Sequence, residues 1–201
     1  MRTEGVLLLT LAALRSKREV GLAVGMVGLD VVMQCSGPQT SATTIATPFD
    51  CMKSIHKSVL LWHTAHEMFA LVTDVASYPQ FLPWCDQACV LDETPLGMTA
   101  KVGMSVSGLR QSFTTRNTHE ADRRVFMQLV DGPFSRLDGT WEFIALGDGT
   151  QRACKIDFRL NYGFSSSALA TVVGPVFDKI AGSLVDAFVK RADQVYGANA
   201  Q

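Results

Sequence analysis

The side chains best placed to do chemistry are two histidines and a glutamate close to residue 65. His63, His66 and Glu67 are residue types that bind zinc or transfer protons. The stretch Thr64-Ala65-His66-Glu67 also fits a capping box, in which the Thr64 hydroxyl and the Glu67 carboxylate each accept a backbone N–H at a helix start. The cap already explains Glu67, and no third ligand stands at a suitable spacing. We therefore expect a helix start here and no metal site.

Five cysteines are the other reactive side chains. Their number is odd, and Cys85 and Cys89 form a C-x-x-x-C pair without a zinc-like partner. No nucleophile triad can be assembled around Cys85, and we find no G-x-S-x-G, Walker-type or G-x-G-x-x-G motif. We expect reduced thiols in a cytoplasmic protein that is not an enzyme and has no covalent cofactor.

The composition is that of a globular domain. The 201 residues are 47% apolar, which is enough for a core, and the formal net charge is −1. A chain so close to neutral lacks a bulk attraction for nucleic acid, so DNA is not an expected partner. A local basic surface remains an alternative, and its arginines would be Arg110, Arg116, Arg123, Arg124, Arg152 and Arg159. We interpret them as the solvated face of a sheet.

Residues 1–51 differ in composition from the rest of the chain. The apolar runs Val6 to Leu14 and Val20 to Met33 are both shorter than the roughly 18 residues of a membrane span. Ser36 to Asp50 is rich in Thr, Ser, Ala and Pro. We expect a disordered or non-native extension, with Met52 as a natural start. A secretory signal and a membrane-surface anchor are the alternatives.

The order of predicted elements is that of an α+β domain. A first strand over Lys53 to Trp62 precedes the capped helix, which Tyr78-Pro79 interrupts. The following strands are predicted over Cys85–Glu93, Thr99–Val106, Gln111–Glu120, Arg124–Val130, Leu137–Leu146 and Gln151–Tyr162. A long helix from about Ser165 to Val195 closes the domain, with a kink expected at Gly174-Pro175. Its apolar stripe is Leu169, Val172, Val176, Ile180, Leu184 and Phe188.

Three sequence motifs resemble a known family. They are Phe69-x-Leu71-Val72-x-Asp74-Val75-x-x-Tyr78-Pro79-x-Phe81-Leu82-Pro83-Trp84-Cys85, Leu129-x-x-Gly132-Pro133-Phe134-x-x-Leu137-x-Gly139-x-Trp141-x-Phe143 and Phe188-x-x-Arg191-Ala192. Together they resemble the coenzyme Q-binding and ribosome-association toxin RatA family of the START-like, polyketide-cyclase-like superfamily. The resemblance implies a helix-grip fold over residues 52–197, with 198–201 as a disordered tail. In that fold a curved antiparallel sheet and the C-terminal helix enclose a cavity for a lipid.

Nine residues are candidates for the wall of that cavity. Proline lies on both sides of Phe81-Leu82 and stiffens this loop, which therefore suits the wall of a preformed cavity. The other candidates come from the mid-chain turn, from one strand and from the long helix, along which the family's cavity lies. The candidates are Phe81, Leu82, Trp84, Phe134, Trp141, Val172, Val176, Phe177 and Ile180.

The favoured function is to bind a polyprenyl quinone. By resemblance the ligand is ubiquinone, carried in support of respiratory electron transport. Burying an isoprenoid tail stabilises the complex by about 25 cal/mol per Å² without any chemistry, and transient contact with the inner face of a membrane fits such a carrier. The first alternative is a RatA-type toxin that binds the large ribosomal subunit and blocks subunit association. The second is a cyclase, which would need an acid–base pair in the cavity.

Overall fold

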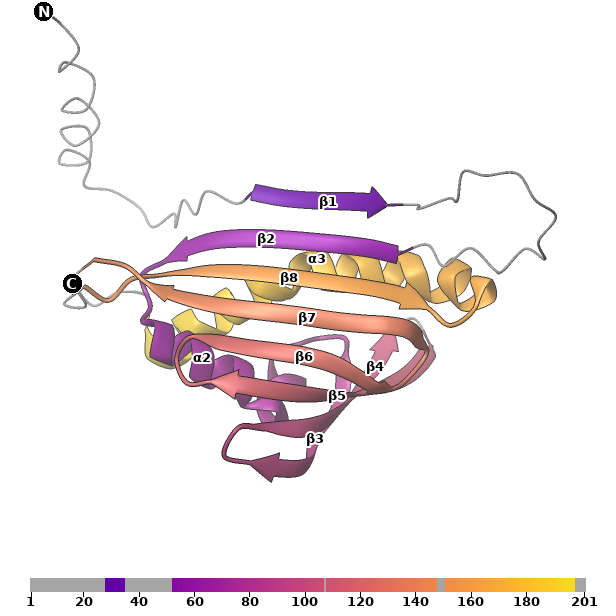
Figure 1. The fold of residues 1–201 in the computed structure, drawn as a ribbon, viewed down its shortest axis with the longest axis horizontal. Coiled ribbons are helices and arrows are strands. Elements are labelled where there is room, and N and C mark those ends of the chain that lie inside the picture. Colours follow the sequence, from indigo (N-terminus) through magenta and orange to yellow (C-terminus); the bar gives the residue numbers. More distant parts are fainter. Residues whose placement is uncertain (1–27, 35–51, 107, 148–150, 198–201) are drawn as a thin grey trace, which may run out of the picture.

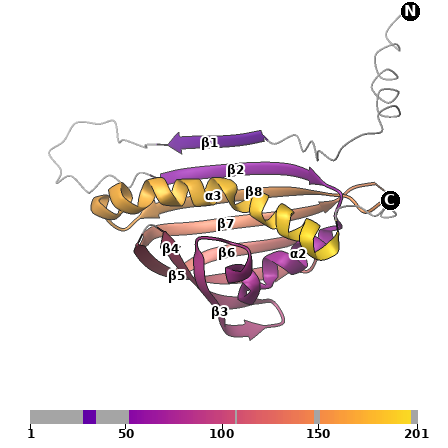
Figure 2. The same ribbon diagram turned by 180° about the vertical axis from the view of Figure 1, so that it is seen from behind.

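The computed structural model describes residues 28–34, 52–106, 108–147 and 151–197 (Figure 1). The strands are β1 (Gly28–Gln34), β2 (Met52–Leu61), β3 (Cys85–Thr94), β4 (Gly97–Val106), β5 (Leu109–Glu120), β6 (Arg124–Asp131), β7 (Phe134–Ala145) and β8 (Cys154–Phe164). The helices are α2 (Ala65–Thr73), the 3₁₀ helix η1 (Val75–Gln80) and α3 (Ser167–Tyr196). All strands pair antiparallel in one sheet of order β1-β2-β8-β7-β6-β5-β4-β3. The long helix α3 crosses one face of it (Figure 2), so the predicted α+β helix-grip architecture is confirmed.

Strand β8 forms the centre of the core. Its side chains alternate between the two faces of the sheet, as its sequence predicts: Phe158 is fully buried, whereas Arg159 is exposed. Asp157 is the exception, because it lies on the outer face and is nevertheless only 6% exposed. Lys155 and Arg159 form ion pairs with its carboxylate, and His56 Nε2 lies 3.0 Å from it.

In the first half of α3 the buried face is shifted by one residue from the predicted stripe, whereas Ile180 and Phe188 of that stripe are buried as predicted. Val172 is 61% exposed, whereas Val173 is 3% exposed. Apolar residues stand in adjacent pairs here, Val172 with Val173 and Val176 with Phe177, so helical spacing alone does not select the buried member. The Phe177 ring packs on the Tyr162 ring of β8, with centroids 4.7 Å apart, so Phe177 is the member of its pair that faces the sheet. The prediction that Val172 is a cavity residue was therefore wrong.

Local sequence sets the ends of α3. The Ser166 hydroxyl accepts the Leu169 N–H at 3.2 Å, which caps the first turn. The helix then continues through Pro175, the site of the predicted kink, and ends at Tyr196. Gly197 follows with a φ of 78°, a conformation that favours glycine after a helix.

Three side-chain contacts join α3 to β2 and to His63, which follows β2 in the chain. They join Lys53 Nζ to Asp178 Oδ2 (2.6 Å), Lys57 Nζ to Asp186 Oδ2 (2.6 Å) and His63 Nε2 to Asp193 Oδ1 (2.8 Å). The first two contacts are eight residues apart on α3, about 12 Å of helix, and four residues apart on β2, about 13 Å of strand. Because these lengths match, α3 runs alongside β2.

Strand β1 is a departure from the predicted extension. No ordered element was expected before Met52, yet Gly28–Gln34 pairs with β2 in an unbroken register from Gly28–Ser58 to Gln34–Met52. Without it, β2 would be an edge strand whose N–H and C=O groups lack partners, so a short β-prone segment gains hydrogen bonds there. The expectation of disorder was wrong for these seven residues. The rest of 1–51 and the predicted tail 198–201 lie outside the described residues.

The predicted capping box is confirmed at the start of α2. The Thr64 hydroxyl accepts the Glu67 N–H at 3.1 Å, and Glu67 Oε2 accepts the Thr64 N–H at 2.8 Å. Arg152 also donates to this carboxylate, with Nη2 to Oε1 at 2.7 Å. Burial raises the pKa of Glu67, but the hydrogen bonds from Arg152 and Thr64 together outweigh burial and lower it.

We expect Glu67→Ala to lower the free energy of unfolding by about 1 kcal/mol, the scale of a helix cap. Because the folded pKa of Glu67 lies below its ordinary value of 4.5, its contribution is complete above that pH and is lost as the pH falls through the folded pKa. Urea unfolding between pH 7 and pH 3 measures both effects. Glu67→Gln, which keeps a hydrogen-bond acceptor, should retain part of the stability and lose the acid dependence. An alanine variant with the wild-type acid dependence would contradict this role.

Candidate ligand-binding cavity

An apolar cavity of about 80 Å³ lies between the sheet and α3. Its wall consists of Val75, Tyr78, Trp84, Ala100, Val102, Phe113, Thr115, Asn117, Met127, Leu137, Trp141, Phe158, Leu160, Phe177, Ile180, Ala181, Leu184 and Phe188. These residues come from η1 and the segment after it, from β4 to β8 and from α3, so the cavity exists only when the helix lies against the sheet.

Four of the nine candidate residues line this cavity. They are Trp84, Trp141, Phe177 and Ile180. Trp141 is 2% exposed, and its ring centroid lies 4.3 Å from that of Phe158. The methyl group of Met127 fills the space beside Gly139, two residues before Trp141. A Cβ at Gly139 would lie 2.6 Å from Met127 Cε.

The remaining candidates lie elsewhere. Leu82 is fully buried in a separate cluster beneath η1, and Phe134 packs its ring on Phe177 at 4.9 Å, outside the cavity wall. Phe81 lies in an outer groove, and Val176 lines a separate void of about 10 Å³. With the exposed Val172, they form no part of this cavity. Their apolar character correctly predicted that Leu82 and Phe134 are buried, but it did not predict which void each residue lines.

Trp84 separates the cavity from the outer groove, because it lines both. The groove lies between the end of η1 and α3. Two of the sequence motifs meet there: Arg191 lies 5.5 Å from the centre of the Phe81 ring, and its Nη2 donates to Gln80 Oε1 at 2.9 Å. Phe81 therefore lines the outer groove and is not part of the cavity wall.

A polar stripe on β5 forms part of the site, and our sequence analysis missed it. Thr115 and Asn117 line the cavity and are 5% and 7% exposed. Asn117 Oδ1 is buried and has no hydrogen-bond partner among the described residues. The same is true of His119 Nε2, two residues further along this face. The signal was the alternation of Phe113, Thr115, Asn117 and His119 in the predicted strand, which places all of them on one face.

The environment of His119 favours its neutral form. Burial lowers its pKa, and Glu93 opposes this only in part. Its ring stands edge-on to Phe69, with centroids 5.9 Å apart. A neutral imidazole in this setting has one nitrogen that donates and one that accepts.

The other titratable groups nearby are held in their protonated forms. Burial raises the pKa of the Cys85 thiol to about 11 and also raises the pKa of Tyr78, whose hydroxyl donates to Val72 O at 2.7 Å. A thiol with so high a pKa is a weak nucleophile near neutral pH. Cys85 therefore has a packing role.

The two histidines considered for a metal site point to different partners. His63 binds Asp193, whereas His66 Nδ1 lies 2.8 Å from Asp122 Oδ1. Within the described ranges, no three His, Cys, Asp or Glu side chains are grouped as metal ligands would be. Their spacing in the sequence reflects the capping box and the anchoring of α3.

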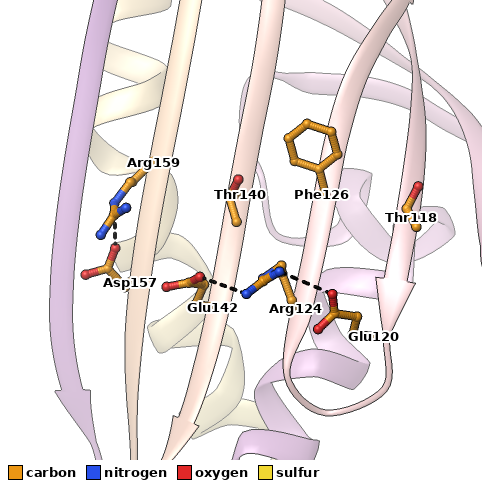
Figure 3. A pocket seen from close by; sticks show the side chains of 8 residues that line it. All are labelled: Thr118, Glu120, Arg124, Phe126, Thr140, Glu142, Asp157 and Arg159. Atoms are coloured by element: carbon orange, nitrogen blue, oxygen red, sulfur yellow. Dashed lines mark hydrogen bonds and ion pairs between the residues drawn. The ribbon is translucent and has the colours of Figure 1, made fainter.

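The outer face of the sheet carries a shallow hollow of about 520 Å³ (Figure 3). Its arginines are paired with acids: Arg124 lies 3.2 Å from Glu120 and 3.4 Å from Glu142, and Arg159 lies 3.1 Å from Asp157. The two Arg124 pairs are partly exposed on both sides, and such pairs contribute little to stability. They do neutralise this part of the surface, which agrees with our interpretation of these two arginines as a solvated sheet face.

Known proteins resemble this chain in sequence and in fold. Residues 62–189 match the family described as polyketide cyclase / dehydrase and lipid transport. The ribosome association toxin RatA of Escherichia coli (strain K12) is 42% identical over 73% of this chain and 91% of its own length. The mitochondrial coenzyme Q-binding protein COQ10 homolog B of Xenopus laevis is 25% identical over 70% of this chain and 58% of its own length.

A solved structure is also similar to this chain in sequence and in fold. The solution structure of an 18 kDa protein from Caulobacter crescentus is 31% identical, covers 72% of this chain and 99% of its own, and superposes with a TM-score of 0.56. Residues 62–189, which the family model matches, include η1, β3 to β8 and most of α3. The chain therefore belongs to the polyketide cyclase/dehydrase and lipid transport family of START-like proteins, as a member related to RatA/PasT and COQ10.

Proposed function

We propose that this chain acts as a RatA-type protein, which binds the large ribosomal subunit in the cytoplasm and blocks subunit association without catalysing a reaction. The observation that carries the proposal is its 42% identity to a protein named for ribosome association, over 91% of that protein. The identity to the coenzyme Q-binding relative is 25%, over 58% of that protein. We therefore favour the RatA-type protein, the first alternative from the sequence, over the quinone carrier.

The size of the cavity also favours this choice. Small-molecule sites commonly enclose about 300 to 1,000 Å³, whereas this cavity encloses about 80 Å³. A polyprenyl tail would require α3 or η1 to move away from the sheet. A smaller apolar ligand is the second candidate, and the apolar wall of the cavity favours it.

Part of the outer sheet face suits contact with ribosomal RNA. Lys101 and Arg116 are exposed, and neither forms an ion pair with another described residue. The register pairs Thr99 with Arg116 and Lys101 with Thr114, which brings the two cations close together on β4 and β5. RNA contacts of this kind depend on phosphate charge and weaken with salt.

Sedimentation of the full chain with purified 30S and 50S subunits tests the proposal. We expect the protein to sediment with 50S subunits, to reduce the yield of 70S particles and to dissociate as salt is raised. A Lys101→Glu/Arg116→Glu variant should bind at least tenfold more weakly. Lys179→Glu, at an exposed site on α3, is the matched control and should bind normally. The proposal would be overturned if the protein bound neither subunit and carried an extractable polyprenyl quinone.

A further inference from the structure

We propose that the hollow on the outer face of the sheet binds one unpaired base of an RNA strand. The base stacks on the ring of Phe126, and Arg116 and Lys101 contact the neighbouring phosphates. This inference rests on the proposed ribosomal function and adds to it the part of the RNA that is recognised. The hollow lies on the opposite side of the sheet from α3 and the cavity (Figures 2 and 3).

Phe126 differs from the other phenylalanines in its contacts. Every other phenylalanine of the described ranges packs its ring on at least one aromatic ring, whereas Phe126 packs on none. Among the described residues it also belongs to neither cluster of the hydrophobic core. Its ring is partly exposed and lines the outer hollow, between Thr118 and Thr140 (Figure 3). A ring without packing partners inside the protein is available to a ligand from outside.

The neighbours of Phe126 suit the edge of a base better than a phosphate. Thr118 of β5 and Thr140 of β7 flank the ring, because the register pairs both of them with Phe126. Their hydroxyl groups donate and accept hydrogen bonds, which suits the polar edges of unpaired bases. The hollow is lined by three acids and two arginines, so its lining carries a net charge of −1. This charge disfavours a phosphate and leaves an uncharged base unaffected.

The cations that suit the phosphates lie on the adjoining strands. Arg116 stands two positions before Thr118 on β5, about 7 Å away on the same face. The register pairs Arg116 with Gln128, which stands two positions after Phe126 on β6. Arg116 is therefore the diagonal neighbour of Phe126, a separation that a long side chain spans. Lys101 follows on β4, and both cations are exposed.

The hollow has room for such an occupant. Its volume of about 520 Å³ lies within the range of about 300 to 1,000 Å³ that is typical of small-molecule sites. Proteins that recognise single-stranded RNA stack unpaired bases on aromatic side chains, and one common module does so on the face of a sheet. Phe126 offers this stacking surface, with the phosphate-binding cations beside it.

Fluorescence anisotropy of the full chain with a labelled single strand of oligoadenylate tests the role of the ring. Phe126→Leu keeps an apolar side chain without a ring and should weaken binding about tenfold, whereas Phe126→Tyr should bind as the wild type does. Ile144→Ala, at an exposed apolar site on the same outer face, is the matched control and should bind normally. Salt should weaken the wild type and Phe126→Leu in parallel, because the ring contacts no phosphate, whereas Arg116→Glu should show a smaller dependence on salt.

Oligoadenylate annealed to oligouridylate supplies the second measurement, because its bases are already paired. The duplex should bind more weakly than the single strand, and Phe126→Leu should bind the duplex as the wild type does. Thermal melts guard against loss of folding, and Phe126→Leu should melt as the wild type does, because its ring packs on no core cluster. The proposal is wrong if the wild type binds single strand and duplex equally, if it binds neither, or if Phe126→Leu binds the single strand normally.

Sedimentation with ribosomal subunits separates this inference from the function on which it rests. A wild-type chain that binds 50S subunits, with Phe126→Leu binding both the subunits and oligoadenylate equally well, would contradict the stacking site alone. A chain that binds oligoadenylate through Phe126 and sediments with neither subunit would contradict the ribosomal proposal alone.

Discussion

Replacing Trp141 with alanine is expected to lower the free energy of unfolding by about 4 kcal/mol, the largest effect of a single substitution that we anticipate. Trp141 is 2% exposed and packs on Phe158 and on Phe188, with ring centroids 4.3 and 5.3 Å away. These rings belong to β7, β8 and α3, so the indole joins sheet and helix. The alanine variant loses the burial of a large ring and leaves a void where the indole contacted its neighbours.

Urea denaturation followed by circular dichroism measures this loss. Trp62→Ala is the control, because Trp62 is 63% exposed, and its replacement should change the free energy of unfolding by less than about 0.5 kcal/mol. The enlarged void in the Trp141 variant should also accept benzene more readily than the wild type does. Equal losses in the two variants would mean that α3 is not held through this ring.

Removal of the acid that pairs with Lys57 is expected to have the second-largest effect. The Lys57 side chain is 3% exposed, and its ammonium lies 2.6 Å from Asp186 and 3.3 Å from Gly182 O. In Asp186→Ala a buried cation keeps only a carbonyl partner. Breaking a buried pair in this way costs about 3–5 kcal/mol. Since the Asp186 side chain is 58% exposed and water can replace it in part, we expect about 2 kcal/mol.

Lys57→Met supplies the comparison. Methionine fills a similar volume without a charge, so this variant should lose less stability than Asp186→Ala, although it also lacks the ion pair. Thermal melts of both variants at pH 7 decide the order. If Lys57→Met were the less stable of the two, the ion pair itself would contribute more than the cost of an unpaired charge.

Local patterns made much of the fold predictable. The capping box at Thr64 depends on residues within one turn, and the alternation along β8 depends on neighbours two positions apart. Both were correct. The predicted strands and the long helix agree with the structure to within a few residues at each end, because the turn residues between them interrupt the periodic patterns.

The rest depended on contacts between distant residues. Neither Lys53 nor Lys57 was expected to face α3, because the sequence does not indicate which acids lie across the core. Asn117 was missed for a related reason: a polar residue in a strand predicts an exposed face, and only the fold shows that this face closes over a cavity. The four candidate residues that do line the cavity are all large and apolar, as that reasoning favours.

The two outer strands of the sheet differ in how they are protected from other chains. Strand β3 ends one side and carries two irregularities in its pairing with β4, together with the acidic residues Asp92 and Glu93. Such features discourage edge-to-edge aggregation. On the other side, β2 is regular over ten residues and, as the border of the sheet, would make a good template for amyloid-like growth. The seven-residue strand β1 covers it, so the strand that borders this side of the sheet is shorter than β2.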